Sequence, residues 1–267
     1  MLCRVRRRIV ELLQDATDVV FSHFHGDHVP LKHANFFQLS FEMLPEHFSA
    51  LRIWSKNGDE SHPRMRRRLH DLQELAGSNL SVVEGCTEGP MSFSHLVPHG
   101  EAETHLGAVM MTRIDLEDKV FVHASDIQLL NIEALNQIIR WQPDIVLTGG
   151  PPLNLDYLKI HSRENAWDNA LQLANSVDTL IIDHHLMRSK AGVQWLKKLS
   201  QVVSGKICCA ADFMERSRLL LEARREELYE TIPVPDNWMD DYIQGKAEAE
   251  SFLITAVNRG VIPPAID

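Results

Sequence analysis

The sequence contains no run of about 18 apolar residues, so we expect no transmembrane helix. The first ten residues, MLCRVRRRIV, carry arginines where a secretory signal would have its apolar segment. Cysteine is scarce, with four residues at Cys3, Cys86, Cys208 and Cys209, and no pair has CxxC spacing. This usage disfavours a disulfide framework and fits reduced thiols, so we expect a cytoplasmic protein.

An excess of positive charge is also missing. The 267 residues include 27 Lys and Arg against 37 Asp and Glu, a formal net charge of −10. Because phosphate contacts need clustered positive charge, nucleic acid is a disfavoured partner, although local basic clusters remain. Hydrophobic residues make up 44% and charged residues 24%, which is the composition of a globular domain with a sizeable core.

The pattern of apolar residues predicts strands early in the chain and alternating strands and helices later, which indicates a layered α/β fold. Strands are predicted over 18–22, 51–55, 80–83, 91–97, 106–114, 119–123, 144–148, 179–182 and near Ile207. Helices are predicted over 3–15, 62–76, 132–141, 163–176, 191–204, 213–230 and 240–259. Pro233 and Pro235 interrupt the chain, which divides it into a main domain, 1–232, and an acidic helical extension, 233–267.

The strongest chemical signal is the segment HFHGDH, which follows the first predicted strand. Residues two apart in an extended segment point the same way, so His23, His25 and Asp27 can converge. Gly26 permits the backbone to turn, which lets His28 join them from the other side. Imidazole and carboxylate ligands favour Zn²⁺, with Mn²⁺ or Fe²⁺ as alternatives.

Four further candidate ligands lie at the ends of later predicted strands. They are His99, Asp126, His184 and His185. A lone histidine after a strand is more often a solvated loop residue, but several in a chain that already has HxHxDH favour a second set of ligands. A hydrolytic site that binds two metal ions needs such ligands from elsewhere in the chain.

In their order and approximate spacing, HFHGDH, His99, Asp126 and His184 resemble the ligand pattern of the metallo-β-lactamase superfamily. That resemblance implies an αββα sandwich with the site at strand ends between two sheets. The segments SHFHGDH, VHASD, GGPP, DHH and LLLEARREELYE further resemble a branch of predicted metallo-hydrolases known mainly from archaea. The resemblance covers about residues 16–230.

The same resemblance implies two metal ions, most simply zinc. The ligands of the first ion would be His23, His25 and His99. Those of the second would be Asp27, His28 and the last histidine, with Asp126 bridging the two ions. Whether His184 or His185 is that last ligand stays open; relatives favour His184, which leaves its neighbour as a supporting or proton-donating group.

The implied chemistry is hydrolysis by a hydroxide shared between the metals, which Asp27 could orient as a catalytic residue. The substrate would be a small or anionic molecule with an ester-type or phosphodiester bond. Arg188 and Lys190 are placed to meet an anion. The alternatives are a non-catalytic metal-binding or scaffold protein and, less favoured, a diiron redox protein, which usually has Glu at the position of His25 and a flavin domain.

Members of this superfamily usually have two or more strands before the motif strand, whereas 22 residues precede His23 here and most of them read as a helix. We therefore expect the first sheet to lack its opening strands. Because an unpaired apolar sheet edge promotes association, a homodimer or a protein of low stability is expected.

Overall fold

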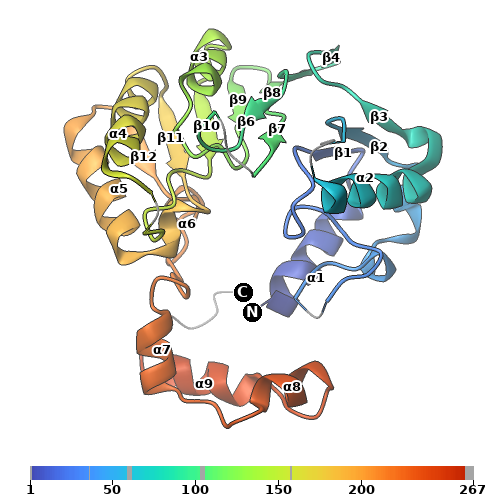
Figure 1. Ribbon diagram of the computed structural model, residues 1–267, viewed down its shortest axis with the longest axis vertical. Coiled ribbons are helices and arrows are strands. Elements are labelled where there is room, and N and C mark those ends of the chain that lie inside the picture. Colours follow the sequence, from blue (N-terminus) through green and yellow to red (C-terminus); the bar gives the residue numbers. More distant parts are fainter. Residues whose placement is uncertain (1, 36, 59–61, 103–105, 157, 262–267) are drawn as a thin grey trace.

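The structure is a computed structural model that describes residues 2–35, 37–58, 62–102, 106–156 and 158–261. Two β-sheets pack against each other, and helices cover the outer face of each (Figure 1). This order of layers confirms the predicted αββα sandwich. The helices among the described residues do not include one that is both long and apolar enough to cross a membrane.

The small sheet is formed by three parallel strands, β1 (Asp18–Phe21), β2 (Arg52–Ser55) and β3 (Leu80–Val82). Helix α2 (Pro63–Ala76) packs on its outer face, where Leu69 and Leu72 share a core with Phe21 and Ile53. Pro63 occupies the first turn of this helix, where its missing N–H costs nothing, and Gly77 ends the helix. This packing fixes the position of the carboxyl end of β1.

The large sheet has the strand order β12-β11-β10-β9-β8-β5-β4. Its strands are β4 (Thr87–Glu88), β5 (Met91–Phe93), β8 (Thr112–Asp115), β9 (Val120–His123), β10 (Ile145–Thr148), β11 (Thr179–Ile182) and β12 (Lys206–Cys208). Strands β9 to β12 run parallel, and β8 and β9 pair antiparallel as a hairpin. The carboxyl ends of the parallel strands therefore lie along one edge, which is where open α/β sheets carry their ligand sites.

Three helices cover the outer face of the large sheet, and they are α3 (Ile132–Arg140), α4 (Ile160–Ala174) and α5 (Lys190–Val202) (Figure 1). On the inner face, Val20 and Trp54 of the small sheet pack with Phe93 of the large sheet. A hydrogen bond from the Met110 N–H to the Ser22 carbonyl, at 2.9 Å, also ties the end of β1 to the other half of the molecule. The two halves of the site are thus held by packing and by backbone hydrogen bonding.

Several predicted elements differ from the observed ones. The strand predicted over 91–97 is divided into β5 and β6 (Val97–Pro98), and the one over 106–114 into β7 (Ala108–Val109) and β8. Strands β6 and β7 pair with each other, outside the large sheet. Short 3₁₀ helices are η1 (Phe41–Met43), η2 (Glu46–Ala50), η3 (Gly77–Asn79) and η4 (Leu186–Arg188).

The long helix predicted over 213–230 is wrong, because the chain forms α6 (Ala210–Phe213), an irregular segment and then α7 (Arg225–Thr231). Within the irregular segment Arg218 donates hydrogen bonds to both oxygens of Asp212, which folds the chain back on α6. The helix predicted over 240–259 is interrupted at Gly245, whose φ is +71°, and becomes α8 (Trp238–Ile243) and α9 (Glu250–Asn258). Tertiary contacts and a left-handed glycine outweigh helix propensity in both places.

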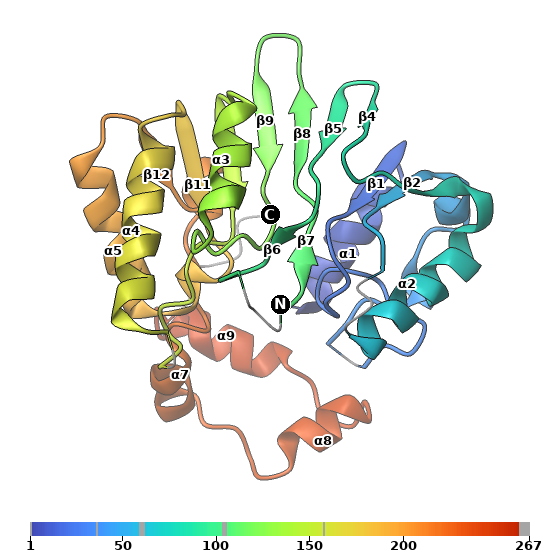
Figure 2. The same cartoon turned by 45° about the horizontal axis from the view of Figure 1, so that its top comes forward.

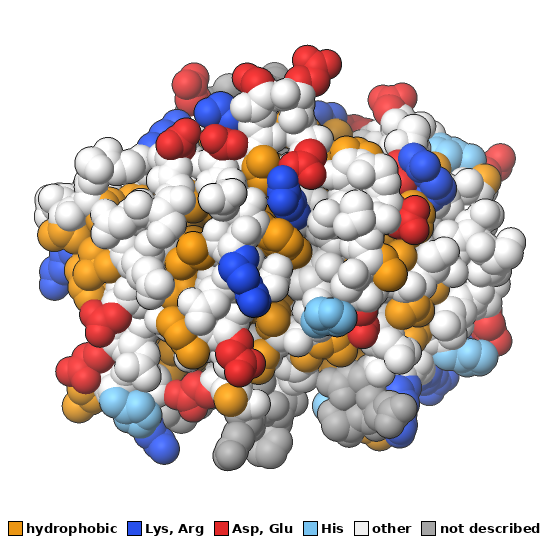
Figure 3. All heavy atoms as spheres, turned by 90° about the horizontal axis from the view of Figure 1, so that it is seen from above, with side chains coloured by type: hydrophobic (Ala, Val, Ile, Leu, Met, Phe, Trp, Pro, Cys, Tyr) orange, Lys and Arg blue, Asp and Glu red, His pale blue; other side chains and the backbone are white. Residues whose placement is uncertain are grey.

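Helices α7, α8 and α9 form a small unit at one end of the molecule, apart from the two sheets (Figures 1 and 2). Its own core joins Leu228 and Ile232 to Leu253 and Ala256. The division of the chain at residue 233 stays a prediction. Figure 3 shows one face of the main body, on which acidic and basic side chains are scattered among apolar ones.

The first described element of the chain is a helix. Before β1 the described residues form helix α1 (Leu2–Leu13) and no strand. Side chains alternate along β9 and β10, and Val122 and Val146 are fully buried on the helix side while their neighbours Phe121 and Ile145 remain half-buried. The predicted homodimer and the predicted loss of opening strands from the first sheet stay predictions.

Candidate metal centre

The HFHGDH segment begins directly after β1, and its first residues are anchored in the protein interior. His23 is 2% exposed and Phe24 is fully buried in the core under α2. The Ser22 hydroxyl lies 3.0 Å from Nδ1 of His23 and 2.7 Å from the hydroxyl of Ser125, which follows β9. This hydroxyl pair links the two halves of the site and leaves Nε2 of His23 directed at Asp126.

The turn of the motif is held by a residue from α2. The Arg68 guanidinium donates a hydrogen bond to the Phe24 carbonyl at 2.8 Å. A Cβ on Gly26 would lie 3.0 Å from Nη2 of Arg68 and 2.7 Å from Nε2 of Gln38, so glycine permits this close approach. The neighbouring basic residues Arg66 and Arg67 are exposed, whereas Arg68 is directed at the loop.

His99 and Asp126 contribute from the other half of the molecule. His99 follows β6 and is 2% exposed. Its Nε2 lies 3.2 Å from Oδ2 of Asp126, and its Nδ1 lies 3.2 Å from the side-chain nitrogen Nε2 of Gln128. Asp126 follows β9, and Ser125 before it has a φ of +56°. For a residue other than glycine this conformation is strained, which is common at functional sites.

His184 and His185 follow β11 in a tight turn. The Asp183 carboxylate accepts hydrogen bonds from the backbone N–H groups of His184 and Ala210, each at 2.8 Å. His184 has a positive φ of +25°, and the N–H of His185 donates to the Gly149 carbonyl at 3.0 Å. A Cβ on Gly149 would lie 3.0 Å from the His185 ring, so the GGPP segment leaves room for that histidine.

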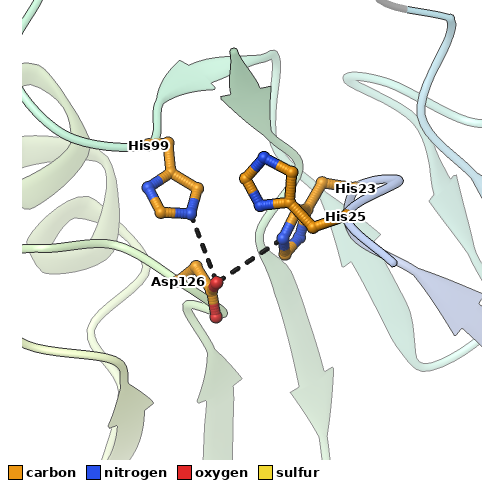
Figure 4. A group of neighbouring side chains, drawn as sticks. All are labelled: His23, His25, His99 and Asp126. Atoms are coloured by element: carbon orange, nitrogen blue, oxygen red, sulfur yellow. Dashed lines mark hydrogen bonds and ion pairs between the residues drawn. The ribbon is translucent and has the colours of Figure 1, made fainter. Parts of the chain in front are cut away.

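Side chains from separate parts of the chain converge on one carboxylate oxygen, Oδ2 of Asp126. Nε2 atoms lie around it at 3.5 Å (His23), 3.1 Å (His28), 3.2 Å (His99), 3.5 Å (His184) and 3.4 Å (His185). Figure 4 shows His23 and His99 reaching Asp126 from two different segments, with the ring of His25 beside that of His23. All eight residues singled out from the sequence therefore lie in one cluster.

Ligand atoms lying within 4.8 Å of one another fall into three overlapping groups. They are His23, His25, His99 and Asp126; then Asp27, His28 and His184; and then Asp126, His184 and His185. The first group contains the three histidines predicted for one ion together with Asp126, and the second contains Asp27, His28 and His184; the assignment of these residues to two ions stays a prediction. His184 belongs to the second set with Asp27 and His28, while the His185 ring lies 5.4 Å from the ring of His99.

Burial sets the charge of the cluster. It lowers the pKa of His23 and of His25 to about 4 and also lowers the pKa of His185, so these rings are neutral near pH 7 and can act as ligands. For His28 burial acts in the same direction, but the carboxylates of Asp126 and Asp27 outweigh it and raise the pKa.

The pKa of Asp126 behaves in the opposite way. Burial raises it, but the close ring nitrogens of His184, His185 and the other histidines outweigh this and hold it well below the usual range. For Asp27 burial also raises the pKa, but the charge of His28 and other effects outweigh burial, and the pKa lies below its usual value. His123, the last residue of β9, has a pKa lowered by burial and lies within the electrostatic reach of Asp126. Both site carboxylates are therefore anionic, as ligation requires.

Three buried ring nitrogens bear on whether the cluster can bind a cation. Nε2 of His23, His28 and His185 makes no hydrogen bond of good geometry within the described part of the chain. Buried polar atoms are normally satisfied, because an unsatisfied one costs about 1–3 kcal/mol. Neutral imidazoles around two carboxylates form a donor set for divalent transition metals, so the residues present fit a metal centre.

Sequence reasoning missed the residues that support the cluster. Ser22, Ser125 and Gln128 contact the histidines, Arg68 supports the motif loop, and Asp183 fixes the second turn. Ser125 and Asp183 stand beside a candidate ligand in the sequence, which is a signal that could have identified them. Arg68 comes from a helix far along the chain and gave no such signal.

A hollow of about 810 Å³ lies elsewhere, at the amino ends of β10 to β12, where its lining includes Asp144, Asp178 and Lys206. The histidine cluster is at the carboxyl ends of the same strands, and no histidine lines the hollow. It therefore does not bear on the chemistry of the cluster.

Comparison with solved structures gives only partial likenesses. A metal-dependent hydrolase of the β-lactamase superfamily, Tm1679, is 15% identical with a TM-score of 0.46, over 77% of this chain and 82% of that one. The E377D mutant of the CmlA β-hydroxylase is 12% identical with a TM-score of 0.45, over 72% of this chain and 42% of that one. Likenesses this weak do not bear on the activity of the chain.

No family model matches the sequence, but curated relatives do. The chain is 43% identical to a UPF0282 protein of Methanosarcina mazei over 251 residues, 94% of this chain and 82% of the relative. It is 34% identical to the UPF0282 protein MK0213 of Methanopyrus kandleri, over 83% of this chain and 80% of the relative. The UPF0282 protein PF0593 of Pyrococcus furiosus is 31% identical, over 84% and 74% respectively. Identity of this extent shows that the chain belongs to the UPF0282 family.

Proposed function

We propose that the protein is a metal-dependent hydrolase whose site binds two divalent cations, most simply Zn²⁺. The observation that carries the proposal is the convergence of five histidine Nε2 atoms on one oxygen of buried Asp126, at 3.1–3.5 Å. Without a cation, this arrangement leaves the buried ring nitrogens of His23 and His28 unsatisfied, which folding would not favour.

The grouping of ligand atoms supports the following assignment. One cation would be held by His23, His25 and His99, the other by Asp27, His28 and His184, and Asp126 would bridge them. When bound, two such cations activate water and neutralise charge that develops on the substrate. His185, 9% exposed, would then be free to donate or accept a hydrogen bond at the reacting group.

Side chains of the protein orient the attacking water and hold the ligands in place. Asp27 has a side chain that is 61% exposed, so it can accept a hydrogen bond from the attacking water and orient it. The Ser22–Ser125 pair holds the His23 ring, Gln128 holds the His99 ring, and Asp183 fixes the turn that carries His184. These contacts place the ligands before substrate arrives, which lowers the cost of reorganisation during the reaction.

The test combines metal content with turnover. Protein loaded with Zn²⁺ and freed of excess should retain two ions by elemental analysis and hydrolyse at least one substrate from a panel of bis(p-nitrophenyl) phosphate, p-nitrophenyl esters and thioesters. His99→Gln should lower both occupancy and turnover, because the ring is buried between Asp126 and Gln128. His70→Gln, on the exposed face of α2, is the matched control and should change neither.

Other outcomes point to the alternatives. Full metal occupancy without turnover of any substrate in the panel would favour a metal-binding or scaffold protein. Iron with a visible absorption band would favour redox chemistry. A protein that retains no divalent metal would contradict the proposal.

A further inference from the structure

We infer that the substrate carries a negative charge on the reacting group itself, as a phosphate ester does, and that Arg188 binds this charge. The inference rests on the proposed hydrolase function and selects between the two substrate classes that the sequence left open, phosphoesters and neutral esters. It depends on where the guanidinium lies, how it is held and which charges surround it.

The guanidinium of Arg188 lies beside a proposed ligand. Its Nη2 is 3.5 Å from Nε2 of His184, the ring nitrogen that the proposed function assigns to a cation. Its charge also acts on His28, another member of the same ligand set. The side chain is 33% exposed, so it is in contact with solvent beside the cluster. A guanidinium in this place would contact the reacting group of the substrate and not a distant part of it.

The backbone that carries Arg188 is rigid. It ends the short helix η4, whose other residues, Leu186 and Met187, are buried. A Cβ on Gly192 would overlap the Leu186 carbonyl oxygen, so the glycine lets α5 approach η4 closely. The hydroxyl of Ser189 accepts a hydrogen bond from the Gly192 N–H at 3.0 Å, which fixes the junction. The guanidinium is therefore presented from a fixed position, which favours specific recognition.

One carboxylate lies beside the Nε of the guanidinium. Oε2 of Glu222 lies 3.5 Å from Nε of Arg188, and the other oxygen of Glu222 lies 3.9 Å from Arg225. Glu222 is thus shared between two arginines. Glu222 contacts Arg188 through Nε, and Nη2 lies beside His184, where a guanidinium can donate to the oxygens of a phosphoryl group.

The nearby Lys190 is not placed to bind an anion at the cluster. Lys190, which the sequence also placed near an anion, is exposed at the first position of α5, and its charge acts on Glu227. Both carboxylates of the cluster, Asp27 and Asp126, would be engaged by cations. With two cations bound and Arg188 beside them, the surroundings of the reacting group would be positively charged, which favours an anionic substrate over a neutral ester.

The test uses inorganic phosphate as the probe and the full chain loaded with Zn²⁺. Calorimetry gives the phosphate dissociation constant for the wild type, Arg188→Gln, Arg188→Lys and Arg225→Gln. Elemental analysis gives the metal content of each, and kcat/KM is measured with bis(p-nitrophenyl) phosphate and with neutral p-nitrophenyl acetate. Arg225→Gln is the matched control, because it removes a positive charge from the same Glu222 at a more distant and more exposed position.

Arg188→Gln is expected to weaken phosphate binding and phosphodiester turnover by about ten- to a hundredfold, as loss of charge-assisted hydrogen bonds does. Arg188→Lys should restore part of this, Arg225→Gln should change either value less than about threefold, and metal content should stay at the wild-type level. Neutral ester turnover should also change less than about threefold.

Unchanged phosphate binding in Arg188→Gln, or an equal loss for both substrates, would overturn the inference while leaving the metal site intact. A wild-type protein that retains no metal would instead overturn the proposed function, and the inference with it. Metal content therefore separates the two failures.

Discussion

Removal of the Asp183 carboxylate should damage both the fold and the metal site. The carboxylate accepts two backbone hydrogen bonds at 2.8 Å, from His184 and from Ala210, so it joins the ligand turn after β11 to helix α6. A hydrogen bond to a charged group contributes about 1.5–3 kcal/mol. Because Asp183 is only half-buried, we take the lower end for each bond, and Asp183→Ala should lower the free energy of unfolding by about 3 kcal/mol.

The effect on metal binding has a separate cause. His184 has a φ of +25°, a conformation that costs about 1–3 kcal/mol and persists only where the surroundings impose it. Without the Asp183 acceptor the turn can relax, and the ring would leave its place beside Asp126. Loss of a contact that orients a ligand typically weakens metal binding about 10- to 100-fold, and we expect this range for Zn²⁺.

The assay pairs urea unfolding of the metal-free protein with competition of the loaded protein against a chromogenic zinc chelator. Asp183→Asn retains an acceptor for the His184 N–H but presents an NH₂ group to Ala210, so its loss of stability should be about half as large. Asp178→Ala removes an exposed carboxylate before the same strand, paired with Lys119 at 3.5 Å, and should change stability by less than about 1 kcal/mol. Zinc affinity in Asp183→Ala equal to that of the wild type would refute the positioning role, even if stability falls.

Three further predictions concern the same site. Acidification of the metal-free protein from about pH 7 to about pH 5 should remove about 2 kcal/mol of unfolding free energy through His23, because its pKa falls from 6.5 to about 4 on folding and the unfolded chain binds the proton first. Denaturation at a series of pH values measures this loss, and a His23→Gln variant with an unchanged pH dependence would contradict it. Gly150→Ala should unfold more easily by at least about 1 kcal/mol, since the residue has a φ of +72° and a Cβ would overlap the Ile182 side chain; a thermal melt equal to that of the wild type would exclude this. Arg68→Met should weaken zinc binding about tenfold by freeing the Phe24 carbonyl, whereas the exposed Arg67→Met should not; equal affinities in the chelator assay would count against the support role.

The candidate ligands could be identified from the sequence because the spacing of the HFHGDH segment is a local property, and their role as ligands stays a prediction. Two-residue alternation after a buried strand places His23 and His25 on one side whatever the rest of the chain does. Most strands and helices were likewise predicted within a few residues, since each carries its own apolar period. The helix predicted over 213–230 was wrong because its end depends on Arg218 binding Asp212, a contact that periodicity does not contain.

Sequence alone thus determined which residue types could bind a metal and at which strand ends they stand. Only the tertiary structure decided that His99, Asp126 and the turn after β11 meet the first motif, since their distances depend on the packing of two sheets. Tertiary structure also directed Arg68 at the motif loop, a contact that joins helix α2 to the segment after β1. The physical reason is that ligand chemistry belongs to each residue, whereas distance and burial belong to the packed chain.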